Sequence, residues 1–206
     1  MTARCELLAQ PQGGCLTNRV ALGWFCASLG VMAHVVRVEV HDRLATAPSD
    51  ELLKLYGDVY AGAPYWNSPA DVAEFAAEWA GLRDEPGIRL ALARAETAAV
   101  GFGLGYVVRA DSGWWGGVTT DDTPTFGIAE FGVLPDWRGQ GIARRLHAAL
   151  LDGRRETRAV LWVRVDAPVA RAVYDSWGYR MVGTIDRPPG YNVMCLDLER
   201  GRMRHG

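Results

Sequence analysis

The chain has 206 residues, of which 49% are hydrophobic and 22% are charged, and its formal net charge is -2. This length and composition predict one globular domain with a hydrophobic core and exclude a disordered chain. The nearly neutral charge, without a basic run, argues against nucleic acid as the main partner, because duplex binding depends on neutralising several phosphates.

The cysteines indicate a reducing compartment. No two of them form a Cys-x-x-Cys pair, and no histidine lies at zinc-ligand spacing from them, so we expect no metal site. A disulfide framework is typical of small, cysteine-dense chains, which this chain is not. We therefore expect free thiols and a cytoplasmic protein. The cysteines are Cys5, Cys15, Cys26 and Cys195.

Residues 1–33 precede the first regular pattern, and we expect the domain to span residues 34–200. The preceding segment is interpreted as an N-terminal extension, disordered or upstream of a true start at Met32. A loosely docked arm and a targeting signal are the alternatives, because residues 21–36 are almost entirely apolar. This stretch is shorter than the ~20 residues of a membrane helix, so we expect no membrane association.

Hydrophobic periodicity predicts alternating strands and helices. The pattern of residues 35–40 predicts a strand, and Pro48-Ser49-Asp50 and Asn67-Ser68-Pro69 each begin a helix with an apolar face. Further strands are expected at 88–95, 98–109, 126–134, 159–165, 179–185 and 192–198, and further helices at 140–154 and 168–177. This order indicates one domain of the mixed α/β class.

Two aromatic segments are candidates for an acceptor site. The loop at residues 111–124 carries Trp114, Trp115, Asp121 and Asp122, whose rings and carboxylates suit a cation. Tyr65 and Trp66 lie between the first two helices. A surface loop without a binding role is the alternative for both segments.

The most informative stretch is a strand end that runs through a glycine turn into a helix: Val133-Leu134-Pro135-Asp136-Trp137-Arg138-Gly139-Gln140-Gly141-Ile142-Ala143. Gly139 and Gly141 lack a Cβ, so they can adopt positive φ and let the backbone approach a ligand. The first N–H groups of the helix have no intrahelical partner, and the helix dipole adds positive charge there. The turn therefore predicts an anion site, to which Arg138 can add a charge-assisted hydrogen bond. A turn that needs glycine only for its conformation is the alternative.

Two common phosphate loops do not fit this stretch. A dinucleotide-binding fingerprint needs a third glycine three residues after Gly141, where the chain has Arg144. A Walker A loop needs Gly-Lys-Ser/Thr, which is absent here.

The string Val-x-Pro-x-x-Arg-Gly-x-Gly-Ile-Ala resembles the acetyl-CoA pyrophosphate loop of the GNAT acyltransferase superfamily, and a weaker resemblance extends over residues 34–198. It implies the GNAT fold, in which a central, mostly antiparallel, twisted sheet is flanked by helices and splayed where acetyl-CoA enters. It also implies that Val133 contacts pantetheine. The residues implied to surround the pyrophosphate are Arg138, Gly139, Gln140, Gly141, Ile142, Ala143 and Arg144. Ala167 departs from the family, in which many members have a cofactor-contacting asparagine at this position.

Glu130 is the candidate general base. It lies in an apolar strand three residues before Val133, where burying a carboxylate without a partner is costly, and the family often has an acid at this position. Strand alternation predicts that Glu130 shares a face with Ile128, Gly132 and Leu134, and that Gly132 leaves room for substrate or water. An ion pair with a neighbouring arginine is the alternative role.

Tyr174 is the candidate general acid, because a phenol stays protonated at neutral pH. It matches the tyrosine that many family members place near the thioester sulfur, and an ordinary half-buried helix tyrosine is the alternative. We expect His147 to be a solvated helix side chain and Cys195 to be a core residue.

These features predict an N-acetyltransferase that transfers the acetyl group of acetyl-CoA, in a ternary complex, to a primary amine of a small molecule or peptide. A non-catalytic acyl-CoA-binding sensor and a nucleotide-binding regulator are the alternatives. The acceptor and the oligomeric state stay open, with a homodimer as one alternative.

Overall fold

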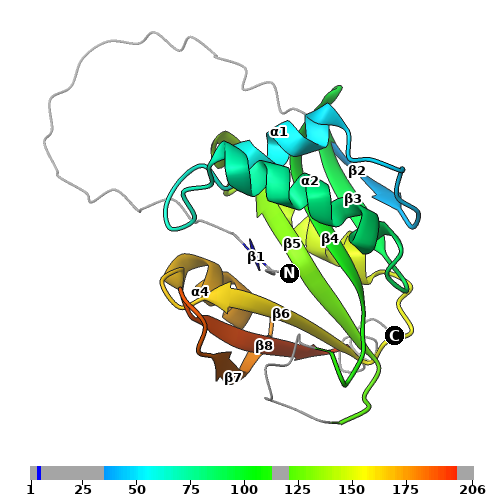
Figure 1. Cartoon of the computed structure of the whole chain (residues 1–206), viewed down its shortest axis with the longest axis vertical. Helices are drawn as coiled ribbons and strands as arrows, with labels where there is room; N and C mark the ends of the chain where they lie inside the picture. Colours follow the sequence, from blue (N-terminus) through cyan, green and yellow to red (C-terminus); the bar gives the residue numbers. More distant parts are fainter. Residues whose placement is uncertain (1–3, 6–34, 113–120, 199–206) are drawn as a thin grey trace, which may run out of the picture.

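The computed structural model describes residues 4–5, 35–112 and 121–198, and it has a mostly antiparallel sheet at its centre (Figure 1). The spatial order of the strands is β2-β3-β4-β5-β6-β8-β7. Along this path β5 and β6 run parallel, and the other neighbours run antiparallel. The strands are β2 (Val36–His41), β3 (Arg89–Ala95), β4 (Ala98–Val108), β5 (Thr125–Val133), β6 (Arg158–Arg164), β7 (Arg180–Ile185) and β8 (Tyr191–Asp197). The predicted fold class is confirmed.

Helices cover both faces of this sheet. The helices α1 (Asp50–Val59) and α2 (Pro69–Arg83) lie on one face, and α3 (Ile142–Leu151) lies on the other (Figure 1). Two core clusters result: the α1-side core, which includes Tyr60, Phe102 and Trp162, and the α3-side core, which includes Leu146 and the buried face of α4 (Pro168–Ser176).

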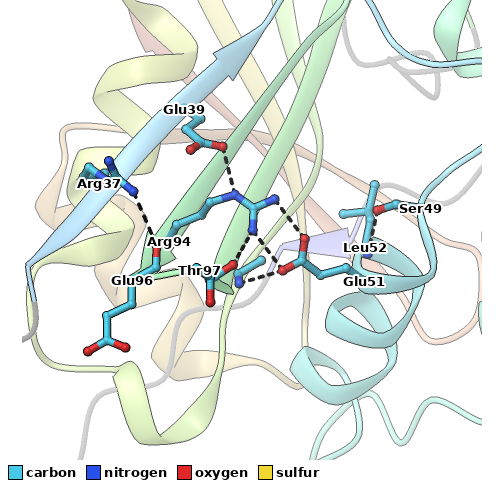
Figure 2. Close-up of polar contacts among 9 residues, drawn as sticks. Arg37, Glu39, Ser49, Glu51, Leu52, Arg94, Glu96 and Thr97 are labelled. Atoms are coloured by element: carbon cyan, nitrogen blue, oxygen red, sulfur yellow. Dashed lines mark hydrogen bonds and ion pairs between the residues drawn. The ribbon is translucent and has the colours of Figure 1, made fainter.

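The N-terminus of α1 is tied to the β3–β4 hairpin by a hydrogen-bond network around Arg94 (Figure 2). The Arg94 guanidinium donates to both carboxylate oxygens of Glu51 (2.9 and 2.8 Å) and to Glu39 on β2 (2.8 Å). Glu51 also accepts the N–H of Ala99 (3.0 Å), and the bond from Arg94 lowers the pKa of Glu51. This network holds α1 against the sheet, and the other end of α1 reaches the candidate site.

β5 and β6 separate after a short parallel ladder. Their pairing covers Thr125 to Ile128 on β5 and Arg158 to Leu161 on β6, and the two strands then diverge (Figure 1). A β-bulge lies at the point of divergence, because Gly105 and Leu104 of β4 pair with Ile128 and Glu130 while Ala129 is the extra residue. We call the space between the diverging strands the split.

A short strand, β1 (Arg4–Cys5), lies in the split between β5 and β6 (Figure 1) and pairs in parallel with β5, with Arg4 opposite Glu130 and Cys5 opposite Phe131. No periodic pattern in the sequence predicted this pairing. The remainder of the expected extension, residues 1–3 and 6–33, lies outside the described residues, as do Trp114 and Trp115.

Candidate active site

The turn after β5 has the conformation that its glycines predicted. A short 3-10 turn (Pro135–Trp137) leads into Gly139 and Gly141, which have φ of 74° and 75°. A Cβ built on either glycine would meet nothing within 4 Å, so the space beside the turn is open. In the described parts of the chain, hydrogen bonding into α3 begins only at Arg145, whose N–H donates to Gly141 (3.2 Å). The preceding N–H groups are therefore available to an anion.

A pocket of about 270 Å³ opens beside this turn, between α3 and α4. It brings together seven of the eight residues expected to bind the cofactor. Its lining consists of Val133, Trp137, Arg138, Gly139, Gly141, Ile142, Ala143, Arg144, Val173 and Trp177. Gln140 is the exception, since its side-chain amide donates to the carbonyl of Asp136 (3.2 Å).

The guanidinium of Arg138 is turned toward backbone carbonyls. Its Nε donates to Val133 (2.9 Å) and its Nη2 donates to Val59 (3.3 Å), the last residue of α1. Arg138 thus ties the glycine turn to the end of β5 and to α1, whereas the sequence suggested a direct bond from this side chain to a phosphate.

Tyr174 lies on the buried face of α4, in the α3-side core. Its side chain is fully buried, with its ring centre 5.6 Å from each of the rings of Trp177 and Tyr179. Its helix neighbours Val173 and Trp177 line the pocket. Ala167 is the N-cap of α4 and is also buried, so no polar side chain stands where many family members have asparagine.

The expectation for His147 is wrong, because this side chain is buried behind the pocket. Its Nε2 lies 2.9 Å from the Tyr179 hydroxyl, and its ring centre lies 4.6 Å from that of Trp177. Burial, assisted by the charge of Arg144, lowers the pKa of His147 to about 4. The expectation for Cys195 is confirmed: it is a buried free thiol, and burial raises its pKa to about 11.

Glu130 is 6% exposed and accepts a hydrogen bond from Tyr60, an aromatic residue at the end of α1. The hydroxyl of Tyr60, the C-cap of α1, donates to Glu130 Oε2 (2.9 Å) and accepts the N–H of Phe131 (3.1 Å). Tyr60 itself is fully buried among the rings of Tyr56, Tyr65 and Phe102. No spacing in the sequence links Tyr60 to Glu130, which are 70 residues apart.

Two expectations about the surroundings of Glu130 are wrong. The bulge at Ala129 breaks the alternation, so Ile128 packs in the α3-side core while Glu130 points to Tyr60 and the α1 side. Gly132 leaves no room for substrate, because a Cβ there would lie 2.2 Å from Cγ1 of Val59. Gly132 instead permits α1 to approach β5.

The candidate acceptor residues divide between structural and exposed positions. Tyr65 is buried against Tyr60, with the Arg164 guanidinium 5.3 Å from its ring centre, whereas Trp66 is 69% exposed. Asp121 binds the guanidinium of Arg158 on β6 (2.7 and 2.9 Å), which lowers the pKa of Asp121. Asp121 therefore anchors the end of its loop.

Two absences concern only residues 4–5, 35–112 and 121–198. No group of three or more His, Cys, Asp or Glu side chains there could hold a metal ion. No helix in the same ranges is long and apolar enough to span a membrane.

Comparison with known proteins gives a family match over most of this chain. The model described as the acetyltransferase (GNAT) family matches residues 50–179, from the start of α1 to the residue before β7. No curated protein matches the chain in sequence.

Solved structures resemble the chain in fold. PH1933 from Pyrococcus horikoshii OT3 is 20% identical in sequence and has a TM-score of 0.55, and the match covers 78% of this chain and 98% of that one. The ribosomal-protein-S18-alanine N-acetyltransferase from Escherichia coli is 18% identical, with a TM-score of 0.54 over 80% of this chain and 94% of that one. Arabidopsis thaliana Naa50, solved with a bisubstrate analogue, is also 18% identical, with a TM-score of 0.50 over 78% and 98%.

Proposed function

Because the chain belongs to the GNAT acetyltransferase family, we propose that it is an N-acetyltransferase that moves the acetyl group of acetyl-CoA to a primary amine of a small molecule or peptide. The acetyltransferase domain comprises residues 34–200 in this proposal, and residues 1–33 are an extension. The buried free thiol of Cys195 supports a reducing, cytoplasmic environment.

The pocket beside α3 is the proposed cofactor site. The N–H groups at residues 139–144 and the positive end of the α3 dipole bind the pyrophosphate. The N–H of Leu134 donates to Val100 on β4 (2.9 Å), so alternation turns the N–H of Val133 toward the split, where it can pair with the pantetheine arm. The pairing of β1 with β5 supports this assignment, because it marks the edge as one that accepts an extended chain.

The observation that supports the proposal best is that the cofactor pocket and the carboxylate of Glu130 lie on opposite faces of the sheet. Val133 and the pocket lie on the α3 side, and the carboxylate of Glu130 points to the α1 side. Acetyl-CoA then enters from the α3 side and the amine from the α1 side, and they meet where β5 and β6 separate. Tyr174 belongs to the α3-side core, on the side from which the cofactor arrives.

The proposed reaction is a direct transfer. Glu130 takes a proton from the ammonium group of the acceptor, and the free amine attacks the thioester carbonyl carbon. A nitrogen–carbon bond forms, the carbon–sulfur bond breaks, and backbone N–H groups near Val133 stabilise the oxyanion. Tyr174 donates its phenolic proton to the departing thiolate. The nitrogen of the new amide releases its second proton to solvent, from which the Tyr174 phenolate is reprotonated, and Glu130 returns its proton to solvent. Tyr60 keeps Glu130 oriented through its hydrogen bond to Oε2.

A thiol-release screen with acetyl-CoA tests the function, with amines, aminoglycosides, amino acids and peptide N-termini as acceptors. We expect release with at least one class, and we expect Glu130→Gln to lower kcat while the Kd of acetyl-CoA changes little. Acetyl-CoA binding without thiol release for every acceptor would favour a non-catalytic sensor. Equal kcat in Glu130→Gln and the parent across pH 6–9 would remove Glu130 from the mechanism.

A further inference from the structure

The side of the split opposite Glu130 is formed by β6, whose Trp162 packs against Tyr191 of the next strand, β8, with 5.7 Å between the ring centres. The last β5–β6 pair is Ile128 with Leu161, so Ala129 and Trp162 are the first residues beyond it on the two strands. Trp162 and Ala129 both belong to the α1-side core, which is the side to which Glu130 points. Trp162 and Glu130 therefore border the split from opposite strands and on the same face of the sheet.

An arginine is held on these aromatic rings at the turn between β7 and β8. The Arg187 guanidinium lies 5.5 Å from the ring centre of Trp162 and 5.8 Å from that of Tyr191. Stacking on a ring restrains a guanidinium while its N–H donors stay free at the edge of its plane. The residue is exposed, so these donors are accessible to a ligand.

The charge of Arg187 has no internal counterion in the described ranges, which distinguishes it from the other arginine at this site. Arg164 lies two residues beyond Trp162 on β6 and pairs across the sheet with Tyr191. It is neutralised by Asp166, with 2.6 Å between Nη2 and the carboxylate. No salt bridge to Arg187 exists within residues 35–112 or 121–198. The α1 side of the split thus has a buried carboxylate, Glu130, and an accessible cation, Arg187.

We propose that Arg187, supported by Trp162 and Tyr191, binds a carboxylate of the acceptor, and that the acceptor is an amine of the amino-acid class. This inference rests on the proposed function, in which Glu130 receives the amine. A substrate with a cationic amine and an anionic carboxylate complements both charges, and each charge-assisted contact is stronger than a neutral hydrogen bond. Polyamines and aminoglycosides, which have no carboxylate, lack a group for Arg187 and add positive charge near it.

The test compares acids with their amides, which differ in the carboxylate but keep the amine. Binding of β-alanine and β-alaninamide, and of glutamate and glutamine, is measured by calorimetry on the full chain saturated with CoA. Thiol release with acetyl-CoA is measured in parallel, as kcat/KM per concentration of the ammonium form, which is the form from which Glu130 takes a proton. We expect β-alanine to be favoured over its amide, and glutamate over glutamine, by about tenfold or more in at least one pair.

Arg187→Gln supplies the matched variant. We expect it to lower binding and kcat/KM of the preferred acid by about tenfold, and to leave its amide and the KM of acetyl-CoA within twofold. Arg180→Gln is the control, because Arg180 is an exposed arginine of β7 whose charge is already paired with Asp197. We expect Arg180→Gln to change neither the acid-to-amide ratio of binding constants nor the acid-to-amide ratio of kcat/KM.

The outcomes separate this inference from the proposed function. Equal binding of acid and amide in both pairs, or an equal loss for both in Arg187→Gln, would overturn the assignment of Arg187. Selective binding of the acid that depends on Arg187, without thiol release, would overturn the proposed catalytic function and leave the carboxylate subsite in place.

Discussion

Replacing Tyr60 with phenylalanine removes one oxygen atom at the centre of the candidate site and leaves the ring in place. The hydroxyl donates to Glu130 (2.9 Å) and accepts the N–H of Phe131 (3.1 Å). The ring is packed against Tyr56, Tyr65 and Phe102, so the substitution creates no large cavity. Its effects should therefore come from the hydrogen bonds that the hydroxyl makes.

The cost to stability follows from the Phe131 N–H. Tyr60 is fully buried, so this donor has no access to water through the site of the lost hydroxyl. A buried donor left unsatisfied costs about 1–3 kcal/mol. Since each kcal/mol lowers the Tm of a domain of this size by about 2–4 °C, we expect a decrease of roughly 2–12 °C in Tyr60→Phe.

The effect on catalysis follows from Glu130. A hydrogen bond donated to a carboxylate favours its charged form, and bonds to charged groups are worth about 1.5–3 kcal/mol. Its loss should move the acid limb of the kcat/KM profile to higher pH, because the charged carboxylate loses a stabilising hydrogen bond. The activity of Tyr60→Phe should therefore approach that of the parent as the pH rises.

The assay is kcat/KM from pH 5 to 9, with thermal unfolding measured on the same samples. Tyr56→Phe is the control, because that ring packs 5.0 Å from Tyr60 in the preceding turn of α1. A lower Tm with an unshifted acid limb would show that the titrating base is not Glu130. An unchanged Tm and an unchanged profile would refute the hydrogen bonding at Tyr60.

Three other perturbations test separate parts of the structure. Burial lowers the pKa of His147 from the ordinary 6.5 to about 4, so between these two pH values the unfolded chain binds a proton that the folded chain does not. The free energy of unfolding should therefore fall as the pH drops from about 6.5 to 4. Urea unfolding at pH 7 and 4.5 should show this decrease, and His147→Gln should make it smaller. Gly132→Ala places a Cβ 2.2 Å from Val59, and should cost about 1–3 kcal/mol in urea unfolding, whereas Gly62→Ala, with nothing within 4 Å, should be nearly neutral. Deletion of residues 2–33 removes the strand paired with β5 and should tighten acetyl-CoA binding several-fold by calorimetry; an unchanged Kd would mean that β1 does not compete with the cofactor.

The sequence correctly predicted those structural features that depend on residues adjacent to one another in the chain, such as helix starts and the glycine turn. Apolar periodicity and the capping serines placed α1 and α2, which begin directly after Ser49 and Ser68. The glycine turn was predictable in detail, because conformation, free N–H groups and the following helix all belong to one contiguous stretch. The helix α3 ends at Leu151, earlier than its expected end at Arg154, since Gly153 takes a φ of 65°.

The burial of His147 was accessible from the sequence but was missed. It lies four residues after Ala143 and three before Leu150, two buried positions of α3, so it shares their stripe on the helix. Because His147 is polar, it was expected to lie in solvent. Its hydrogen-bond partner, Tyr179, which offsets the cost of burying the ring, lies 32 residues away in the sequence. Tyr60 was missed for a similar reason, because its contact with Glu130 depends on how α1 packs against β5.

The bulge at Ala129 explains why alternation failed at the residue that matters most. With a regular strand, Glu130 would share the side of Ile128, which packs in the α3-side core near the cofactor pocket. The extra residue rotates Glu130 to the α1 side and leaves Phe131 and Val133 in the α3-side core. The bulge also lies where the β5–β6 ladder ends. One inserted residue therefore accompanies both the split and the separation of the proposed base, Glu130, from the proposed cofactor pocket. A direct transfer needs both features, since the amine and the thioester must reach the same point from opposite faces of the sheet.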